Sequence, residues 1–377
     1  MPAPPTTPSP LGHPHFPPSP SKGALRVPFY YGWVNLVVAA LAMTATFPGR
    51  THGLGLITTP LLDSLRLDAV HYGTLNFWAI LVGTAFCWPA GRLLDRFGAR
   101  AVLVAVAVAL GAVVLLMSRV TEVVGLLVTL TLVRGLGQGA LSVVSMALVG
   151  KWFTRRLGPA MGVFAVLLAI GFIAATLGVG AAVKVSGWRA AWGGIGVALL
   201  VGLVPVAWLL ARDTPEACGL APEDAPPAAT APGPARLDLG LGAALRTPAF
   251  WVFSLGTSLF GLMWSAITLF NQAILAEHGF GAETFVVVMA VLTASGLVAN
   301  LVGGWAATRW SMGRLLAVGL ALFALSLVVF PGLRTEAQVI AYAVALGLAG
   351  GVITVVFFAV YGQAFGRTHL GQIQGAA

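Results

Sequence analysis

The sequence predicts an all-α polytopic membrane protein, and three observations carry this prediction. Of the 377 residues, 58% are hydrophobic and only 9% are charged, whereas a soluble domain carries about 25% charged residues. Apolar runs of the roughly 20 residues needed to cross a bilayer recur along the chain. These runs are continuous and rich in Leu, Val, Ala and Gly, which indicates helices, because the strands of a membrane barrel alternate with period two.

The apolar runs divide the chain into ten predicted spans. They cover residues 31–60, 73–92, 101–118, 123–151, 158–183, 188–211, 248–276, 283–307, 314–333 and 337–362. Residues 1–28 are Pro-rich and are expected to form a disordered cytosolic tail. The Pro- and Ala-rich residues 212–246 are expected to form a flexible cytosolic linker. The linker separates a six-helix bundle at 29–211 from a second, incomplete bundle at 247–377, with four helices and the start of a fifth.

The excess of basic residues follows the positive-inside rule and predicts no nucleic-acid partner. With the N-terminus in the cytosol, fourteen of the 21 Lys and Arg residues fall on cytosolic segments and five on outside loops. We therefore expect a multi-pass protein of the cell (inner or plasma) membrane with a cytoplasmic N-terminus. Its expected partners are the lipid bilayer and a small solute, and we expect a monomer.

An internal repeat relates the two bundles. GALSVVSMALVGKWF (Gly139–Phe153) and GVITVVFFAVYGQAF (Gly351–Phe365) share the spacing of their Gly and Phe residues, and LGPAMG (Leu157–Gly162) returns as LGQIQG (Leu370–Gly375). Two homologous six-helix halves are predicted. The second half needs two further spans of roughly 20 residues each, so we expect a truncated sequence, about 50 residues short. A natural ten-helix protein is the alternative.

A charged segment, GRLLDRFGAR, follows the second span and is expected to be a cytosolic loop. It resembles the signature of the major facilitator superfamily, whose pattern is matched by Gly91, Asp95, Arg96, Gly98 and Arg100. The resemblance implies a two-bundle, major-facilitator-type fold with ten of twelve transmembrane helices present. It also implies that Gly91 permits close helix approach, and that Asp95 meets an arginine or a helix N-terminus to hold the cytosolic side closed in one state. The alternative is a charged turn that merely obeys the positive-inside rule.

Two further segments extend this resemblance. The degenerate copy GWAATRW (Gly304–Trp310) has Thr308 where Asp would stand, which predicts an asymmetric latch. RGLGQGA in the fourth span resembles the second signature of the superfamily, and one polar helix face is predicted to contain Arg134, Gln138, Ser142 and Ser145. Arg134 and Gln138 are candidates for coupling or gating. The alternative for Arg134 is a structural arginine bonded to main-chain carbonyls.

The stretch FPGRTHGLG (Phe47–Gly55) interrupts the first span with a Pro-Gly pair, which is expected to break the helix. The segments YYGW, KWFTRRLGPAMG, GWRAAW and RDTPEACGLAPED resemble the branch that holds oxalate/formate antiporters and monocarboxylate-type carriers. In that branch a Gln-like residue follows the pair. Arg50 stands there instead, which favours an anionic substrate, although Arg50 could also snorkel to the outer interface.

Six residues are predicted to bind substrate: Arg50, His52, Asn76, Trp264, Asn271 and Tyr361. Arg50 and His52 are about 200° apart on a helix, so both face a cavity only if the helix unwinds. Trp264 and Asn271 share a face of the seventh span with Thr268 and Gln272. The competing interpretation of each polar group is an interhelical hydrogen bond, worth about 0.6 kcal/mol.

The acidic residues are all assigned to loops or tails, so the sequence predicts no buried carboxylate for proton coupling. It contains no P-loop, catalytic set or metal-ligand cluster, so neither an enzyme nor a cofactor or metal site is predicted. We expect a secondary active transporter that works by alternating access on a small organic anion, a mono- or dicarboxylate. An exporter of hydrophobic or drug-like compounds and a non-transporting membrane solute sensor are the alternatives.

Overall fold

The computed structural model describes residues 30–220 and 238–377, apart from the side chains of residues 268–270, 272, 273 and 282. Within this part the regular elements are helical. The first half contains α1 (Gly32–Thr44), α2 (Thr51–Gly55), α3 (Thr58–Leu65), α4 (Ala69–Thr84), α5 (Cys87–Phe97), α6 (Ala99–Met117), α7 (Val123–Val133), α8 (Ser142–Trp152), α9 (Leu157–Ala198) and α10 (Val204–Leu210). The second half contains α11 (Leu241–Ala244), α12 (Pro248–Glu277), α13 (Ala282–Ala306), α14 (Met312–Val329), α15 (Glu336–Phe365) and α16 (Leu370–Ala376).

Short 3₁₀- and π-helical segments interrupt or join these helices. The 3₁₀ segments are η1 (Phe47–Gly49), η4 (Glu216–Cys218) and η5 (Phe330–Gly332), and the π segments are η2 (Arg134–Leu141) and η3 (Leu199–Leu203). The predicted tail at 1–28 and the central part of the predicted linker lie outside the described residues.

Nine helices in the described residues are long and apolar enough to cross a membrane. One of them, covering Leu157–Leu210, contains Gly187 at φ 80° and ψ 163°, where two helices meet at a sharp turn. A positive φ is readily adopted only by glycine, so Gly187 ends the fifth predicted span and begins the sixth. The ten predicted spans are therefore present.

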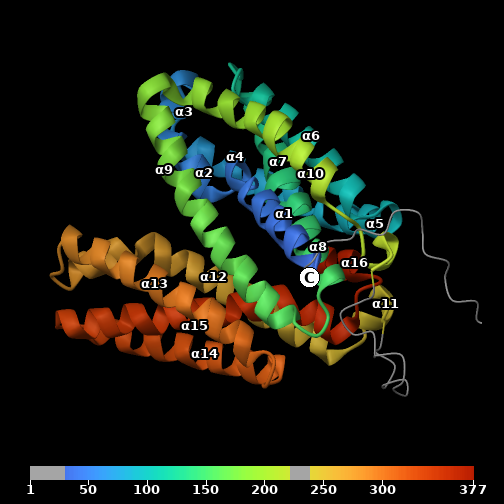
Figure 1. The fold of residues 1–377 in the computed structure, drawn as a ribbon. Helices are drawn as coiled ribbons and strands as arrows, with labels where there is room; N and C mark the ends of the chain where they lie inside the picture. Colours follow the sequence, from blue (N-terminus) through green and yellow to red (C-terminus); the bar gives the residue numbers. More distant parts are fainter. Residues whose placement is uncertain (1–29, 221–237) are drawn as a thin grey trace, which may run out of the picture.

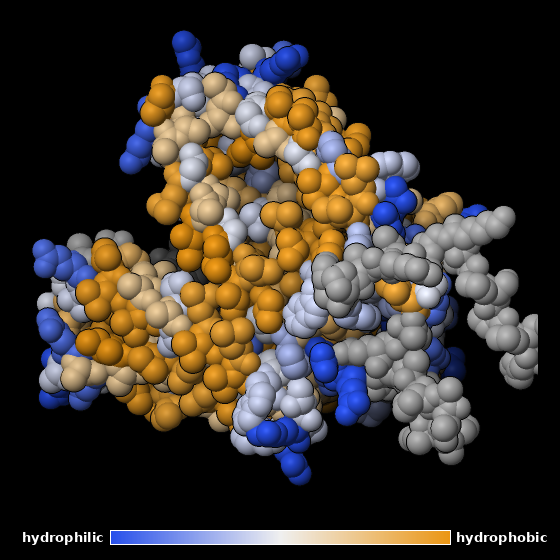
Figure 2. Space-filling view, in the orientation of Figure 1, coloured by the Kyte–Doolittle hydropathy of each residue, from blue (hydrophilic) through white to orange (hydrophobic). Residues whose placement is uncertain are grey.

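The helices form two halves that diverge at one end and meet at the other (Figure 1). The first half is built from α1 to α10 and the second from α12 to α15, while α16 packs against α5 and α8 of the first half. The end where α5, α8, α11 and α16 lie together is called the closed end. Figure 2 shows hydrophobic residues across the middle of both halves and hydrophilic residues gathered at the helix ends, as expected for a chain that spans a bilayer.

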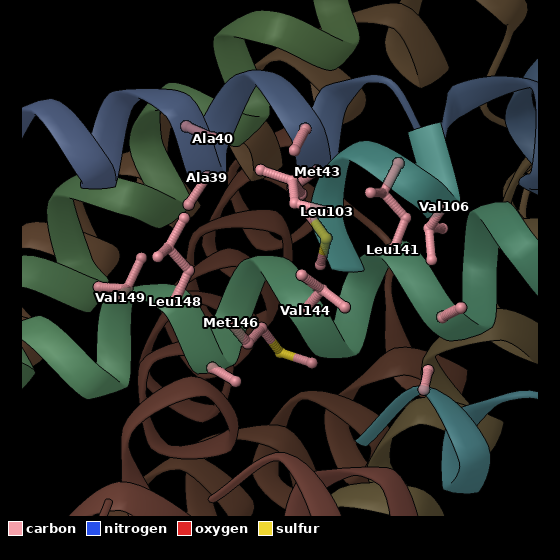
Figure 3. Close-up of a cluster of buried hydrophobic side chains, with 14 of the residues drawn as sticks. Ala39, Ala40, Met43, Leu103, Val106, Leu141, Val144, Met146, Leu148 and Val149 are labelled. Carbon is pink, nitrogen blue, oxygen red and sulfur yellow. The ribbon is translucent and has the colours of Figure 1, made fainter. Parts of the chain in front are cut away.

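Small and medium-sized side chains pack the middle of the contact between α1 and α8. In Figure 3, Ala39, Ala40 and Met43 of α1 face buried residues of α6 and α8, and Ala39 is fully buried. Small residues at such interfaces allow helix backbones to approach closely within a membrane. This packing fixes α1 against α8, so the break that follows α1 is held at a defined place.

The prediction that GRLLDRFGAR forms a loop after the second span is wrong for most of this segment. Helix α5 continues through Phe97 and ends at Gly98, whose φ of 87° terminates the helix. The expectation rested on charge, but charged residues are tolerated in the last turns of a helix that ends at the membrane surface. Asp95 therefore lies within α5, and its side chain is only 5% exposed.

Candidate functional site: a central cavity and its closed end

The first span is interrupted where the Pro-Gly pair predicts. After α1 ends at Thr44, η1 forms one tight turn, and Arg50 is extended with φ −101° and ψ 154° before α2 begins at Thr51. Gly49 lies directly against the fourth span, because a Cβ at this position would come within 2.5 Å of Val133 O. The break is therefore seated against the end of α7 and η2.

Arg134 holds this break through neutral oxygen atoms. Its Nη1 donates to Gly49 O at 3.2 Å, Thr51 Oγ1 at 3.3 Å and Gln138 Oε1 at 3.0 Å, and its Nη2 donates to Asn76 Oδ1 at 3.0 Å. These bonds join the interruption to α4 and η2. Arg134 thereby fixes the backbone from which Arg50 projects.

Arg50 points into the protein rather than toward an outer interface. Its Nε donates to Thr46 Oγ1 at 2.9 Å, and its Nη2 donates to Ser142 Oγ at 2.9 Å. Its guanidinium carbon lies 5.4 Å from the ring centre of Phe172, within cation–π range. Among the described residues Arg50 has no carboxylate partner and its Nη1 has no hydrogen-bond partner.

A cavity of about 540 Å³ lies between the two halves, and both guanidinium groups line it. The first half contributes Arg50, Arg134, Gln138 and Ser142, and the second contributes Thr257, Ser258, Thr354 and Phe358. The described residues that line it include no Asp or Glu. The cavity is therefore basic, and it is shared by the two units that must move relative to each other in alternating access.

The other predicted substrate-binding residues lie outside this cavity. His52 is exposed on α2, and Asn76 is occupied by its bond to Arg134. Tyr361 is 1% exposed and bonds to Ser254 Oγ at 3.0 Å, and Asn271 is fully buried in α12. Trp264 lines a second, smaller cavity. The side chains of Thr268 and Gln272, which share the predicted face with Trp264, lie outside the described residues.

Several lining residues of the second half were not predicted, although the internal repeat contains a signal for them. The repeat pairs Ser142 with Thr354 and Met146 with Phe358. All four line the cavity, on equivalent faces of α8 and α15. For these two pairs the repeat therefore identifies the cavity residue of the second half from that of the first.

Asp95 lies at the closed end, where it meets a helix N-terminus of the other half. Its carboxylate accepts from Gly371 N at 3.3 Å and Gln372 N at 2.9 Å, the first turn of α16. It also pairs with Lys151 Nζ at 3.1 Å, and both side chains are at least nine-tenths buried. Lys151 was not predicted as the partner. The contacts among Asp95, Lys151, Gly371 and Gln372 are called the gate below.

Close glycine packing accompanies the gate, and its counterpart in the other half lacks a carboxylate. A Cβ at Gly91 would overlap Gly371 O, so α5 and α16 touch through their backbones. In the equivalent pair, a Cβ at Gly304 would lie 2.9 Å from Gly158 O. There Thr308 is exposed and donates to Trp305 O of its own helix. The gate is thus asymmetric in its polar contacts.

The remaining residues of the signature shape the turn after α5. Gly98 has φ 87°, and a Cβ there would lie 2.5 Å from Asp213 Oδ1, which accepts from Arg100 N at 2.8 Å. The Arg100 guanidinium stacks on Trp208 with 4.5 Å between its central carbon and the ring centre. Arg96 is exposed and lies over Phe97. Asp213 was not predicted, because its contact is 113 residues distant in sequence.

A second carboxylate, in the described part of the predicted linker, caps the turn that follows α15. Asp238 Oδ1 accepts from Arg367 N at 2.9 Å beside Gly366, whose φ is 86°. Arg367 also pairs with Glu216 and donates from Nη1 to Lys151 O at 3.3 Å. The described residues of the predicted linker therefore take part in the contacts between the halves at the closed end.

These features define a helical membrane carrier with two halves around a central cavity that is shut at one end. The sequence profile of the Major Facilitator Superfamily matches residues 33–377. The chain belongs to this superfamily, and it is a multi-pass secondary transporter rather than an enzyme.

A solved structure shares the fold. The crystal structure of the human organic anion transporter MFSD10 (TETRAN) aligns with a TM-score of 0.62 at 16% sequence identity, over 92% of this chain and 87% of that chain. At this identity the likeness concerns the fold alone. No curated protein sequence matches this chain.

Proposed function

We propose that this protein transports a small organic anion with a carboxylate group, and that Arg50 binds the carboxylate. The observation that carries the proposal is the position of the Arg50 guanidinium in a cavity lined by both halves. Its known partners there are neutral side chains. A guanidinium presents a planar fork of donors that matches a carboxylate, and its charge is not matched by any described acidic residue of the cavity.

Arg134 has a different role in this proposal. Its four bonds to neutral acceptors hold the broken helix in place, and they leave it fewer donors for a solute. We therefore assign substrate contact to Arg50 and positioning to Arg134. Two guanidinium groups in one cavity also favour an anion over a cation, since a like charge in a low-dielectric site is repelled.

Transport in this proposal follows alternating access. The gate is shut in the present state, so the cavity is expected to open toward the other end, where the halves diverge (Figure 1). With a cytoplasmic N-terminus, the gate faces the cytosol and the cavity faces outward, and we propose the cell (inner or plasma) membrane as the site of action. Exchange of two anions requires no protonatable carboxylate in the cavity, which fits its lining.

Counterflow in proteoliposomes tests the proposal. Proteoliposomes that contain the full-length protein are loaded with unlabelled formate, acetate, oxalate or succinate. Uptake of the same labelled anion is then measured for the parent, Arg50→Gln and Arg50→Lys. We expect Arg50→Gln to lose uptake and binding of every carboxylate while its thermal unfolding midpoint stays close to that of the parent. Arg314→Gln is the matched control, because Arg314 is exposed at the start of α14.

Other outcomes of the assay separate the alternatives. Uptake of neutral hydrophobic compounds that is indifferent to Arg50→Gln would favour the drug-like exporter. Carboxylate binding without flux would favour the sensor. Binding of neutral or cationic solutes but of no carboxylate would refute the proposal.

A further inference from the structure

Two neighbouring hollows lie on the surface of the first half, between α1 and the helices of the fifth and sixth spans. The larger hollow measures about 360 Å³ and the smaller about 320 Å³. Leu41 and Val206 line both hollows, and Leu41 is 49% exposed, so the two lie end to end along α1 and are open to their surroundings where they meet. Together they are called the α1 groove below.

The α1 groove offers a ligand an almost entirely apolar surface. Apart from Thr44 and Trp33, its lining residues carry no polar side-chain atom. The hydroxyl of Thr44 donates to Ala40 O of its own helix at 2.9 Å. The groove lies on helices that are long and apolar enough to cross a membrane, so the medium around it is hydrocarbon rather than water. A lipid tail is therefore the ligand with matching chemistry.

The length of the α1 groove suits one such tail. Its lining residues on the first span run from Trp33 to Pro48, which corresponds to about 20 Å along a helix. A bilayer core of about 30 Å holds two tails end to end, so the groove has room for one tail over its whole length. At its far end Phe47 and Pro48 belong to η1, the break from which Arg50 projects. A tail in the groove therefore packs directly against that break.

The other end of the α1 groove carries a hydrogen-bond donor and a positive charge. Trp33 lines the groove here and packs against Phe153, just after α8, with 5.0 Å between the ring centres. Its indole N–H has no hydrogen-bond partner among the described residues. Arg212 follows Leu210 of the groove wall, and its main-chain N–H donates to Asn35 Oδ1 of α1 at 2.9 Å. The Arg212 guanidinium bonds to one main-chain carbonyl and has no acidic partner within the described part of the chain.

These two groups favour a negatively charged headgroup. Tryptophan is typical of the membrane interface, where its ring lies at the level of the headgroups. An arginine guanidinium matches the geometry of a phosphate group, and basic residues near the membrane surface attract anionic lipids. We propose that the α1 groove binds a phospholipid with a negatively charged headgroup. Its tail lies along α1 as far as the break, and its headgroup contacts Trp33 and Arg212.

Native mass spectrometry of the full-length protein in a mild detergent tests the site. The protein is mixed with equal amounts of dioleoyl phosphatidylglycerol and dioleoyl phosphatidylcholine. We expect the parent to hold one lipid in the groove and to favour phosphatidylglycerol about fivefold, as one arginine near the membrane surface contributes. Arg212→Gln should bring this ratio to about one while a lipid is still bound. Gly202→Leu should hold one lipid fewer than the parent, because a Cβ at Gly202 meets nothing within 4 Å and the larger side chain fills the groove.

Gly73→Leu on α4 is the matched control. A Cβ at Gly73 also meets nothing within 4 Å, but Gly73 does not line the groove, so this variant should hold as many lipids as the parent. Ala198→Phe blocks the same wall if Gly202→Leu fails to fold. Equal retention of the two lipids by the parent, or unchanged retention in both blocking variants, overturns the proposal. No transported solute enters the measurement, so its result is independent of the anion proposal.

Discussion

The gate predicts a large effect of replacing a single carboxylate, Asp95→Asn. In the closed state Asp95 accepts two main-chain N–H bonds from α16 of the opposite half. Its pairing with Lys151 lies within the first half, so we expect that contact to persist when the halves separate at this end. Among the contacts of Asp95, the bonds to α16 are therefore the ones that we expect to be lost in the open state.

The size of the effect follows from these contacts. Hydrogen bonds to a charged group contribute about 1.5–3 kcal/mol each, and Asn keeps one neutral carbonyl acceptor for them. We take the closed state to lose about 2 kcal/mol of stabilisation relative to the open state. This corresponds to about a 30-fold shift of the closed–open equilibrium toward the open state. The population with an open gate should rise by that factor.

Native Cys87 serves as the reporter, because it lines the cavity close to the gate. In a Cys218→Ser background, we would measure the rate at which a membrane-impermeant maleimide, added on the side of the gate, labels Cys87. We expect the rate to rise about 30-fold in Asp95→Asn, in line with the shift derived above. Asp63→Asn, which alters an exposed carboxylate of α3, is the control. A labelling rate within twofold of the parent in a folded Asp95→Asn protein would refute the reasoning.

Three further predictions concern stability, measured as the thermal unfolding midpoint in detergent. Gly98→Ala places a side chain at φ 87°, so we expect the free energy of unfolding to fall by about 1–3 kcal/mol. We expect no such fall in the control Gly313→Ala, where a Cβ meets nothing within 4 Å. Arg134→Lys cannot keep all four bonds, and buried acceptors left unpaired should cost about 1–3 kcal/mol; an unchanged midpoint would show that these bonds do not hold the break. His278 has its pKa raised because both ring nitrogens contact main-chain carbonyl oxygens. A raised folded-state pKa stabilises the fold at pH values below the ordinary histidine pKa near 6.5, and this stabilisation is lost as the pH rises through the folded-state pKa. The unfolding midpoint of the parent should therefore fall as the pH rises above ~6.5, and that of His278→Gln should not.

Much of the fold follows from composition and glycine placement alone. Continuous apolar runs predict the spans, and the Pro-Gly pair at Pro48 and Gly49 predicts the break that the structure contains. The end of α5 was misplaced because charge was taken as the sign of a loop. The better signal was Gly98, whose positive φ terminates the helix three residues after Asp95.

The site was harder to predict, because its contacts join distant parts of the sequence. Arg50 was recognisable as a charge within an apolar run. The bond of Asn76 to Arg134 and the burial of Tyr361 against Ser254 depend on how whole helices pack, and polarity within a span does not distinguish such pairs from a cavity lining. Thr354 was obtainable from the repeat, since its counterpart Ser142 had been identified.

The π-helical segment Arg134–Leu141 sets the rotation of everything that follows it in the fourth span. A helix turns by about 100° per residue, and a π segment holds more residues in each turn than an α-helix does. If the same residues formed an α-helix instead, the extra residue held by the wide turn would add about 100° of rotation, and α8 would turn by that amount relative to α7. Ser142 would then turn away from Arg50, and Met146 would leave the cavity wall, although neither residue had been altered. The wide turn at Arg134–Leu141 therefore decides which residues of the fourth span line the cavity, because it sets the rotation of α8 as well as its position.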